Sequence, residues 1–233
     1  LRRVKDATEI ERIAAAAALT DELYGLLLER GLTGSTEAQL DGWLTGWMRQ
    51  QGAEPSFPPI VASGPNGASP HAEPGPREIR PGELVTVDMG VRLDGYCSDC
   101  TRTFATGSEA ELDDLSLEIY EVTLRANEAG LAAVRAGAGG SAVDEVARAL
   151  IREAGFGDNF GHGLGHGVGL EIHEAPRLGP SSDDELIAGE VVTVEPGIYV
   201  SGATGVRIED LVVVGHDGVA RNLSPLTKEL TFV

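Results

Sequence analysis

Four segments of the chain carry apolar residues at the spacing of an α-helix. The first begins at Asp6, where Glu9 three residues later is typical of a capping box, and Gly31 ends it. We expect Ser35 to cap the second helix and Gly52 to end it. The inner stripe of the second helix is predicted to be Leu40, Trp43, Leu44 and Trp47.

The third and fourth helical segments lie in the second half of the chain. The third places Leu112, Leu115, Ile119, Val122, Ala126 and Ala133 on one face. The fourth is expected to open at Ser141 and to end at Gly155. Its predicted inner residues are Val146, Leu150 and Ile151.

Alternating segments rich in Val and Thr predict strands between these helices. A short strand is expected over residues 57–62, before a loop at 63–76 that has too many Gly and Pro residues for a helix or strand. Residues 82–104 carry Asp94-Gly95, a strong signal for a hairpin turn. Residues 189–200 and 204–214 predict a second pair of strands.

The chain contains an internal repeat. GELVTVD at 82–88 returns as GEVVTVE at 189–195, and Gly-Ser occurs at 34–35 and again at 140–141. Two halves, each of two helices and a hairpin, are therefore predicted. In both halves the Val/Thr strand ends on a carboxylate, which strand alternation by itself does not require.

The predicted turns set the register of each hairpin. With a two-residue turn at 94–95, residue 88 lies opposite 101, so Asp99 shares the face of Asp88. With a loop at 201–203 and no bulge, Glu195 lies opposite Glu209. Carboxylates that face one another repel unless a cation lies between them. These acids therefore predict a metal site, the alternative being four solvated side chains on exposed strands.

Five histidines are distributed unevenly. His162, His166 and His173 fall within one Gly-rich segment, and His71 follows the Pro-rich loop. His216 lies in a predicted turn and receives no role. The segment GHGLGHGVG lacks the Lys-Ser/Thr of a phosphate-binding loop, and HEAPR is not a zinc-binding HExxH.

Composition narrows the classes of protein. A net charge of −19 disfavours nucleic acid as a partner. No segment approaches the roughly 20 apolar residues of a membrane span, and no basic-then-apolar signal opens the chain. Cys97 and Cys100 are expected to be free buried thiols, as in a cytoplasmic protein. Because the chain opens at Leu1, we expect it to be a fragment or a processed chain.

Five segments together resemble the pita-bread metallopeptidases, which include methionine aminopeptidase, aminopeptidase P and prolidase. They are SGPNGASPH, VDMGVRLDGYCSDCTRTF, GHGLGHGVGLEIHE, TVEPGIY and GVRIEDLVVV. The resemblance implies an α+β, pita-bread fold, in which helix-helix-hairpin halves form a pseudo-two-fold repeat around a curved antiparallel sheet. It implies one catalytic domain over residues 1–233. The implied metal ligands are Asp88, Asp99, His166, Glu195 and Glu209.

The ligand set of four carboxylates and one imidazole favours Mn²⁺, with Co²⁺, Fe²⁺ or Zn²⁺ as alternatives. Two such divalent ions are expected, bridged by Asp99 and Glu209. A metal-bridged hydroxide would attack the substrate, with Glu195 taking its proton. His173 is expected to donate to the oxyanion, while His71 and His162 orient the substrate and assist the leaving nitrogen.

In having His162, the chain resembles the proline-specific branch of the family. These members carry an N-terminal domain, absent from this chain, and the resemblance suggests a homodimer for the intact protein. Arg207 shares the strand face of Glu209 and is expected to anchor the carboxylates beside the substrate. Arg177 is the candidate to hold the free carboxylate of an Xaa-Pro dipeptide, and an exposed loop arginine is the alternative.

The resulting hypothesis is a peptidase that cleaves Xaa-Pro dipeptides, with a small peptide as partner. Aminopeptidase P acting on longer peptides and a methionine aminopeptidase-like enzyme are the alternatives within the same chemistry. A non-catalytic peptide-binding module is the alternative from another class, and the complete ligand set argues against it.

Overall fold

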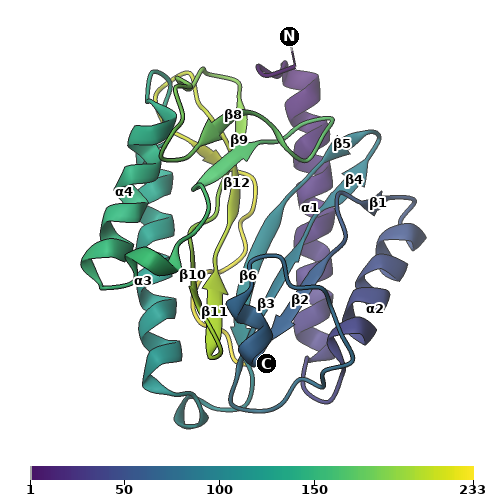
Figure 1. The fold of residues 1–233 in the computed structure, drawn as a ribbon. Helices are drawn as coiled ribbons and strands as arrows, with labels where there is room; N and C mark the ends of the chain where they lie inside the picture. The colour runs from purple at the N-terminus through teal and green to yellow at the C-terminus, as the bar shows by residue number, and fades with distance from the viewer. Residues whose placement is uncertain (1) are drawn as a thin grey trace.

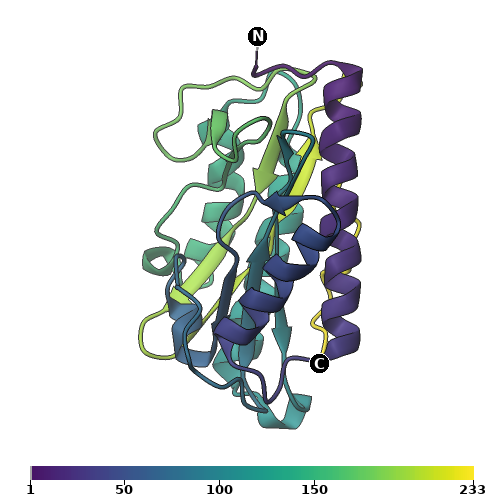
Figure 2. The ribbon, with the colours of Figure 1, turned by 90° about the vertical axis from the view of Figure 1, so that its right-hand side faces the viewer.

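The computed structural model describes residues 2–233, in which four α-helices flank a set of antiparallel strands (Figure 1). The helices are α1 (Ala7–Arg30), α2 (Glu37–Gln50), α3 (Asp114–Ala133) and α4 (Gly140–Glu153). Helices α1 and α2 lie on one side of the strands and α3 and α4 on the other. Figure 2 shows α1 along one side of the molecule and the loops between β7 and β9 on the opposite side.

The strands form several small sheets. They are β1 (Glu54–Pro55), β2 (Ile60–Ser63), β3 (Leu84–Met89), β4 (Val91–Leu93), β5 (Tyr96–Cys97), β6 (Cys100–Ala105), β7 (Gly165–Gly167), β8 (Glu174–Leu178), β9 (Val191–Val194), β10 (Gly197–Val200), β11 (Thr204–Arg207), β12 (Asp210–Val213) and β13 (Arg221–Asn222). The sheet orders are β2-β3-β6, β1-β4-β5, β10-β11 and β13-β12-β9-β7-β8. The first two sheets belong to the first half of the chain and the last two to the second half.

The predicted start of α1 is confirmed and that of α2 moves by one residue. Asp6 and Glu9 form the expected capping box. In α2 the cap is Thr36 in place of Ser35, because the Thr36 hydroxyl accepts from the backbone N–H of Gln39 and completes a second capping box. The buried stripe of α2 is Leu40, Leu44 and Met48 together with Glu37, whereas Trp43 and Trp47 are only partly buried.

The inner face of α4 differs from the prediction. The helix begins at Gly140, with Gly139 as its cap, so Ser141 does not open it. Val146 is 41% exposed, while the buried apolar residues are Val143, Ala147 and Ile151. In α3 the predicted Ile119, Val122 and Ala126 are buried as expected. The early strand is shorter than predicted, at Ile60–Ser63, and the following loop opens with a 3₁₀ turn at Gly64–Ala68.

Both predicted hairpin registers are confirmed. In the first hairpin Leu93 pairs with Tyr96 across the turn, and Asp88 pairs with Thr101. In the second hairpin Val200 pairs with Thr204. Val194 pairs with Asp210 and Gly197 with Arg207, and the same register places Glu195 opposite Glu209.

The two halves meet through their hairpins. The backbone N–H of Glu209 donates to the Thr101 carbonyl over 3.0 Å, and the Thr103 hydroxyl donates to the Arg207 carbonyl over 2.9 Å. One apolar core packs α1 and α2 against strands of the first half, and another packs α3 and α4 against strands of the second half. The pseudo-two-fold arrangement of helix-helix-hairpin halves therefore brings the ends of both hairpins to one centre. None of the helices in residues 2–233 has the length and apolar character that a membrane crossing requires.

Candidate metal centre

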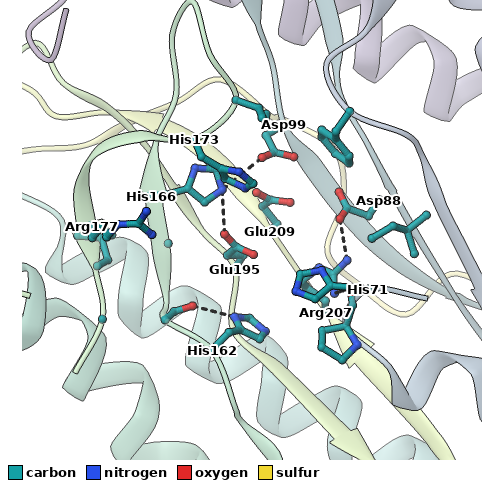
Figure 3. A pocket seen from close by; sticks show the side chains of 18 of the residues that line it. His71, Asp88, Asp99, His162, His166, His173, Arg177, Glu195, Arg207 and Glu209 are labelled. Atoms are coloured by element: carbon teal, nitrogen blue, oxygen red, sulfur yellow. Dashed lines mark hydrogen bonds and ion pairs between the residues drawn. The ribbon is translucent and has the colours of Figure 1, made fainter. Parts of the chain in front are cut away.

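Five side chains from both halves of the chain point into one cavity (Figure 3). Asp88 lies near the end of β3 and Asp99 precedes β6, while Glu195 and Glu209 lie where the strands of the second hairpin are interrupted. His166 comes from the middle of β7. The structure thus brings together all five residues that the sequence predicted to be metal ligands.

The ligand atoms of Asp99, His166 and Glu209 all lie within 4.8 Å of one another. The Nε2 atom of His166 is 3.2 Å from Glu195 Oε1 and 3.6 Å from Asp99 Oδ2. Asp88 lies outside the three-residue group, and in Figure 3 Asp99 and Glu209 are drawn between it and His166. The set is therefore elongated, with His166 towards one end and Asp88 towards the other.

His166 reaches the centre because glycines flank it. A Cβ atom on Gly165 would lie 2.1 Å from the Thr193 carbonyl oxygen, and one on Gly167 would lie 2.3 Å from the Ala175 carbonyl oxygen. Strand β7 therefore fits between its neighbours only with these two glycines. The Gly-rich composition of this segment is explained by close backbone packing around the histidine.

Hydroxyl groups that the sequence analysis did not single out orient two of the carboxylates. Thr101 Oγ1 donates to Glu209 Oε2 over 2.7 Å, and Thr193 Oγ1 donates to Glu195 Oε1 over 3.0 Å. Strand parity was a usable signal for Thr193, because a residue two positions before Glu195 shares its face. The role of Thr101 could not be predicted in this way, because its contact with Glu209 depends on how the two hairpins meet.

Burial makes the ionised state of three carboxylates unfavourable. Burial raises the pKa of Asp99 well above its ordinary value, and the negative charges of Glu209, Asp88 and Glu195 raise it further. Burial and the charges of Glu195 and Asp88 also raise the pKa of Glu209 well above its ordinary value. Burial raises the pKa of Asp88, although the Arg207 guanidinium opposes this shift. A cation among these groups would favour their ionised forms.

Glu195 behaves differently because it contacts His166. Burial opposes its ionisation, but the hydrogen bond and charge of His166 lower the pKa of Glu195 to about 2. Burial lowers the pKa of His166, but the bond to Glu195 outweighs this effect and the pKa is raised. Each residue of this pair therefore favours the charged form of the other.

Two buried carboxylate oxygens of this centre lack hydrogen-bond partners among the described residues. Asp88 Oδ1 and Glu209 Oε1 are buried and accept no hydrogen bond. Unsatisfied buried carboxylate oxygens are costly unless a cation or a water molecule contacts them. Together with the oxygen-rich donor set, they show that these residues fit divalent cations.

Tyr199, another residue that the sequence analysis missed, links His162 to Arg207. The Arg207 Nη1 atom donates to the Tyr199 hydroxyl over 2.8 Å, and that hydroxyl lies 2.9 Å from His162 Nε2. His162 Nδ1 is 2.8 Å from the Gly163 carbonyl, which can only accept. Neutral His162 therefore carries its proton on Nδ1 and accepts from Tyr199 at Nε2. Burial lowers the pKa of His162, which favours this neutral form.

The other two predicted histidines are exposed and line the cavity. The ring of His173 meets that of His166 edge-on, with centroids 4.4 Å apart. Burial and the charge of His166 lower the pKa of His173. His71 follows Pro70, whose carbonyl accepts from Arg207 Nη1 over 3.2 Å. His216 lies outside the cavity in an exposed turn, where the sequence predicted a turn.

A buried glutamate holds the loop that carries His71. Glu37 of α2 is fully buried and accepts from the Ser63 backbone N–H at 2.8 Å, the Ser63 hydroxyl at 2.7 Å and the Gly75 backbone N–H at 3.2 Å. The Asn66 side-chain amide also donates to it. One carboxylate therefore fastens both ends of the loop 63–75.

Arg177 stands at the rim of the cavity. Its Cα pairs with that of His166 across β7 and β8, and its side chain is exposed. Its guanidinium makes no ion pair with any residue in 2–233, and Figure 3 shows it directed towards the histidines. The cavity has a volume of about 1010 Å³. A peptide carboxylate could therefore reach this cation.

Comparison with known proteins agrees with this geometry. Residues 7–216 match metallopeptidase family M24, and the chain belongs to this family. It is 40% identical over 231 residues to the Xaa-Pro dipeptidase of Pyrococcus furiosus, a match that covers 99% of this chain and 65% of that protein. It is 42% identical over 215 residues to a putative Xaa-Pro aminopeptidase of Mycoplasma genitalium, covering 92% of this chain and 60% of that protein.

A solved structure confirms the fold. The Xaa-Pro dipeptidase from Bacillus anthracis superposes with a TM-score of 0.95 at 42% identity, covering 100% of this chain and 64% of that one. The pita-bread fold predicted from the sequence is therefore correct. Family membership implies divalent metal ions, and the buried group of Asp99, His166 and Glu209 fits them. The chain spans less than two thirds of the length of these relatives.

Proposed function

We propose that this chain is the catalytic domain of a peptidase that hydrolyses Xaa-Pro dipeptides with the help of two divalent metal ions. The convergence of Asp88, Asp99, His166, Glu195 and Glu209 in one cavity, with two carboxylate oxygens unsatisfied, carries the proposal. The names of the Pyrococcus furiosus and Bacillus anthracis relatives support the choice of substrate.

The proposed ligands divide into two groups that share their central members. Asp99 and Glu209 would contact both ions, Asp88 would complete one site, and His166 with Glu195 the other. The oxygen-rich set favours Mn²⁺, with Co²⁺, Fe²⁺ or Zn²⁺ as alternatives. When bound, such an ion pair would supply an activated water near neutral pH and polarise the scissile carbonyl.

The remaining roles belong to the side chains around this centre. Glu195, whose carboxylate lies beside His166 in the cavity, is the proposed acceptor of the attacking water's proton. His173 would donate to the oxyanion and His71 would contact the substrate. His162 would assist the leaving proline nitrogen, which must gain a proton because a deprotonated amine is a poor leaving group. Since both ring nitrogens of His162 are engaged, direct contact with substrate requires its bond to Tyr199 to open.

Recognition of a dipeptide is assigned to Arg177. A free carboxylate next to the proline ring would pair with its unpartnered guanidinium, an interaction that arginine makes in a bidentate manner. Arg207 lies between Asp88 and Tyr199 and would hold the substrate-facing wall in place.

A reducing compartment such as the cytoplasm is part of the proposal. Cys97 and Cys100 are both free and buried. Their pKa values are raised by burial, which keeps the thiols protonated. Protonated buried thiols are unreactive and fit a protein that needs no disulfide.

The test is a comparison of three peptides with Mn²⁺-loaded protein. Ala-Pro, Ala-Pro-Ala and Met-Ala-Ser are incubated separately, and the products are resolved by chromatography. Cleavage of Ala-Pro in preference to the other two supports the proposal, and preference for Met-Ala-Ser contradicts it. Metal content measured by mass spectrometry checks the ion pair independently, since absence of bound metal would contradict the proposed centre.

An aminopeptidase P activity on longer peptides is the second candidate. The cavity volume of about 1010 Å³ lies at the upper end of the roughly 300–1,000 Å³ typical of drug-sized ligands, so it has room for more than a dipeptide. The Mycoplasma genitalium relative is named as a putative Xaa-Pro aminopeptidase. Faster cleavage of Ala-Pro-Ala than of Ala-Pro in the same assay would favour this candidate.

A further inference from the structure

The second hairpin is interrupted at its two carboxylates. Strand β9 ends at Val194 and β10 starts at Gly197, while β11 ends at Arg207 and β12 starts at Asp210. The backbone N–H of Glu209 turns away from the partner strand and bonds to Thr101 of the first hairpin. Buried carbonyl groups beside such an interruption need hydrogen-bond donors.

Two side chains supply those donors. Asn127 of α3 is fully buried, and its Nδ2 atom donates to the Val194 carbonyl over 2.9 Å and to the Ile208 carbonyl over 3.2 Å. These carbonyls belong to the residues immediately before Glu195 and Glu209. The Nη1 atom of Arg102 donates to the carbonyl of Glu209 itself. The backbone around both carboxylates therefore depends on two side chains that lie outside the cavity.

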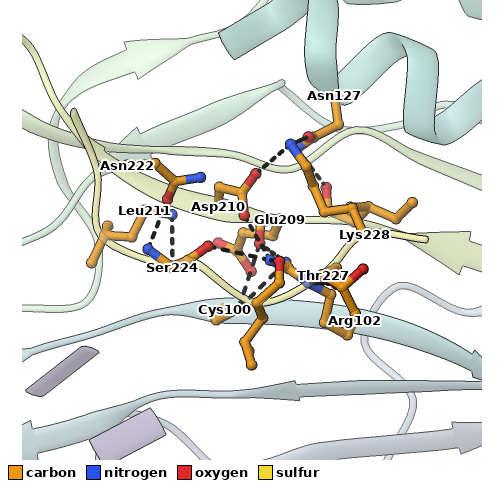
Figure 4. Close-up of polar contacts among 12 residues, drawn as sticks. Cys100, Arg102, Asn127, Glu209, Asp210, Leu211, Asn222, Ser224, Thr227 and Lys228 are labelled. Carbon is orange, nitrogen blue, oxygen red and sulfur yellow. Dashed lines mark hydrogen bonds and ion pairs between the residues drawn. The ribbon is translucent and has the colours of Figure 1, made fainter. Parts of the chain in front are cut away.

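Charged groups hold these two side chains in turn (Figure 4). Asp210 Oδ1 is 2.8 Å from Arg102 Nη2, and Asp210 Oδ2 is 3.0 Å from Lys228 Nζ. Lys228 Nζ also donates to Asn127 Oδ1 over 2.8 Å. Arg102 donates further to the carbonyls of Leu226 and Thr227. The segment that carries Lys228 is thus joined to the back of the metal centre.

We propose that Arg102, Asp210, Lys228 and Asn127, here called the buried charge network, are positioning residues that set Glu195 and Glu209 for cation binding. The inference rests on the proposed function, because it assumes that these carboxylates hold metal. The network contacts the backbone of Glu209 and of the residues just before Glu195 and Glu209, but none of the carboxylate oxygens of these two glutamates. Its effect on the ions is therefore through geometry, which determines how well a rigid ligand set accepts a cation.

The sign of the expected change separates positioning from simple electrostatics. Removing a positive charge near a cation site should by Coulomb's law strengthen cation binding. If Lys228 acts by holding Asn127 and Asp210, its removal should weaken binding instead. Lys228 suits this test because its side chain is 20% exposed. A methionine at this position can therefore extend towards the surface without disrupting the core.

The experiment measures Mn²⁺ affinity by isothermal titration calorimetry on wild type, Lys228→Met and Asn127→Ala. Removal of residues that orient metal ligands typically weakens binding by roughly 10- to 100-fold, and we expect a loss in this range for both variants. Asn127→Ala changes no charge and therefore tests the same geometry without a Coulomb contribution. The matched control is Arg152→Met, which removes an exposed cation paired with Glu145 and should leave the affinity within about twofold.

Thermal unfolding of each metal-free variant accompanies the titration. Affinity that falls in Lys228→Met and Asn127→Ala, in protein that unfolds cooperatively at the assay temperature, supports the network. Unchanged or tighter binding in both variants, with wild type binding normally, overturns the network and leaves the proposed function standing. Failure of wild type to bind Mn²⁺ or any alternative divalent ion overturns the proposed function and the network with it.

Discussion

Arg207 of the second half and Asp88 of the first half form an ion pair at the wall of the metal centre, with Nη2 of the arginine 2.7 Å from Oδ2 of the aspartate. Both side chains are buried, and Arg207 also donates to Tyr199. Burial of the Asp88 carboxylate without a positively charged partner such as Arg207 would be strongly unfavourable. The pair therefore links the two hairpins and favours the ionised form of one predicted ligand, in opposition to its burial.

This pair predicts a pH-dependent defect. Arg207→Met should lower kcat/KM for Ala-Pro by roughly 10- to 100-fold, because Asp88 loses the partner that orients it. The loss should be greater at pH 6 than at pH 8, since the pKa of Asp88, already raised by burial, rises further without the guanidinium. A pH-rate profile measures this shift. Arg207→Lys, which retains the charge, should recover part of the activity at pH 6, and equal losses at both pH values would contradict the explanation.

Arg177 predicts a change in substrate binding. Arg177→Ala should raise KM for Ala-Pro by roughly tenfold, about 1.4 kcal/mol, with little change in kcat, because it removes a contact to the free carboxylate. Steady-state kinetics with Ala-Pro amide is the matched control, since this substrate lacks the carboxylate. If KM rises equally for the amide, Arg177 does not recognise the carboxylate.

We predict that the loop carrying His71 depends on the carboxylate of Glu37, which lies far from it in the sequence. Glu37→Gln places an N–H₂ group against existing donors from Ser63, Asn66 and Gly75. Leaving buried donors unsatisfied costs about 1–3 kcal/mol, so we expect lower stability, faster proteolysis within the loop and reduced kcat/KM. Limited proteolysis and urea unfolding measure these effects. The exposed Glu78→Gln should change neither, and equal resistance of both variants would show that Glu37 does not fasten the loop.

Asp21 predicts a stability change that depends on pH. Burial raises the pKa of Asp21 to about 6 from an ordinary value of 3.8, and its Oδ1 atom is buried without a partner among the described residues. Because the folded protein holds this proton more tightly than the unfolded chain, stability falls as the pH rises from 3.8 through 6. Asp21→Asn should therefore stabilise the metal-free protein by about 1 kcal/mol at pH 7.5, a figure reduced for partial exposure.

The advantage of Asp21→Asn should shrink as the pH falls towards 4, where Asp21 is protonated in the folded protein. Urea unfolding in the presence of a chelator at pH 7.5 and at pH 4.5 measures the difference. The exposed neighbour Glu22→Gln should have a small effect that is similar at both values. A stabilisation by Asp21→Asn that is equal at the two pH values would exclude the titration of Asp21 as its cause.

Local rules were sufficient for much of the fold. Asp94-Gly95 specified a two-residue turn, and strand alternation then carried the register back to Asp88 and Thr101. The predicted cap of α2 was wrong by one residue, because Ser35 and Thr36 are both good capping residues. Only Gln39, which forms a capping box with Thr36, decides between them. Val146 was misplaced because an apolar residue near a helix stripe is not necessarily covered by another element.

The sequence by itself determined which face of each hairpin carries its acids, because side chains in a strand alternate with a period of two. Through the family resemblance it also predicted five metal ligands, and the structure brings these five residues into one cavity. Only the tertiary structure decided that Tyr199 joins His162 to Arg207 and that Asn127 and Arg102 donate to backbone carbonyls beside the two glutamates. These contacts depend on where the strand pairing breaks and how the helices pack across it. Neither is encoded in local spacing, because residues far apart in the chain must already be packed together before such bonds can form.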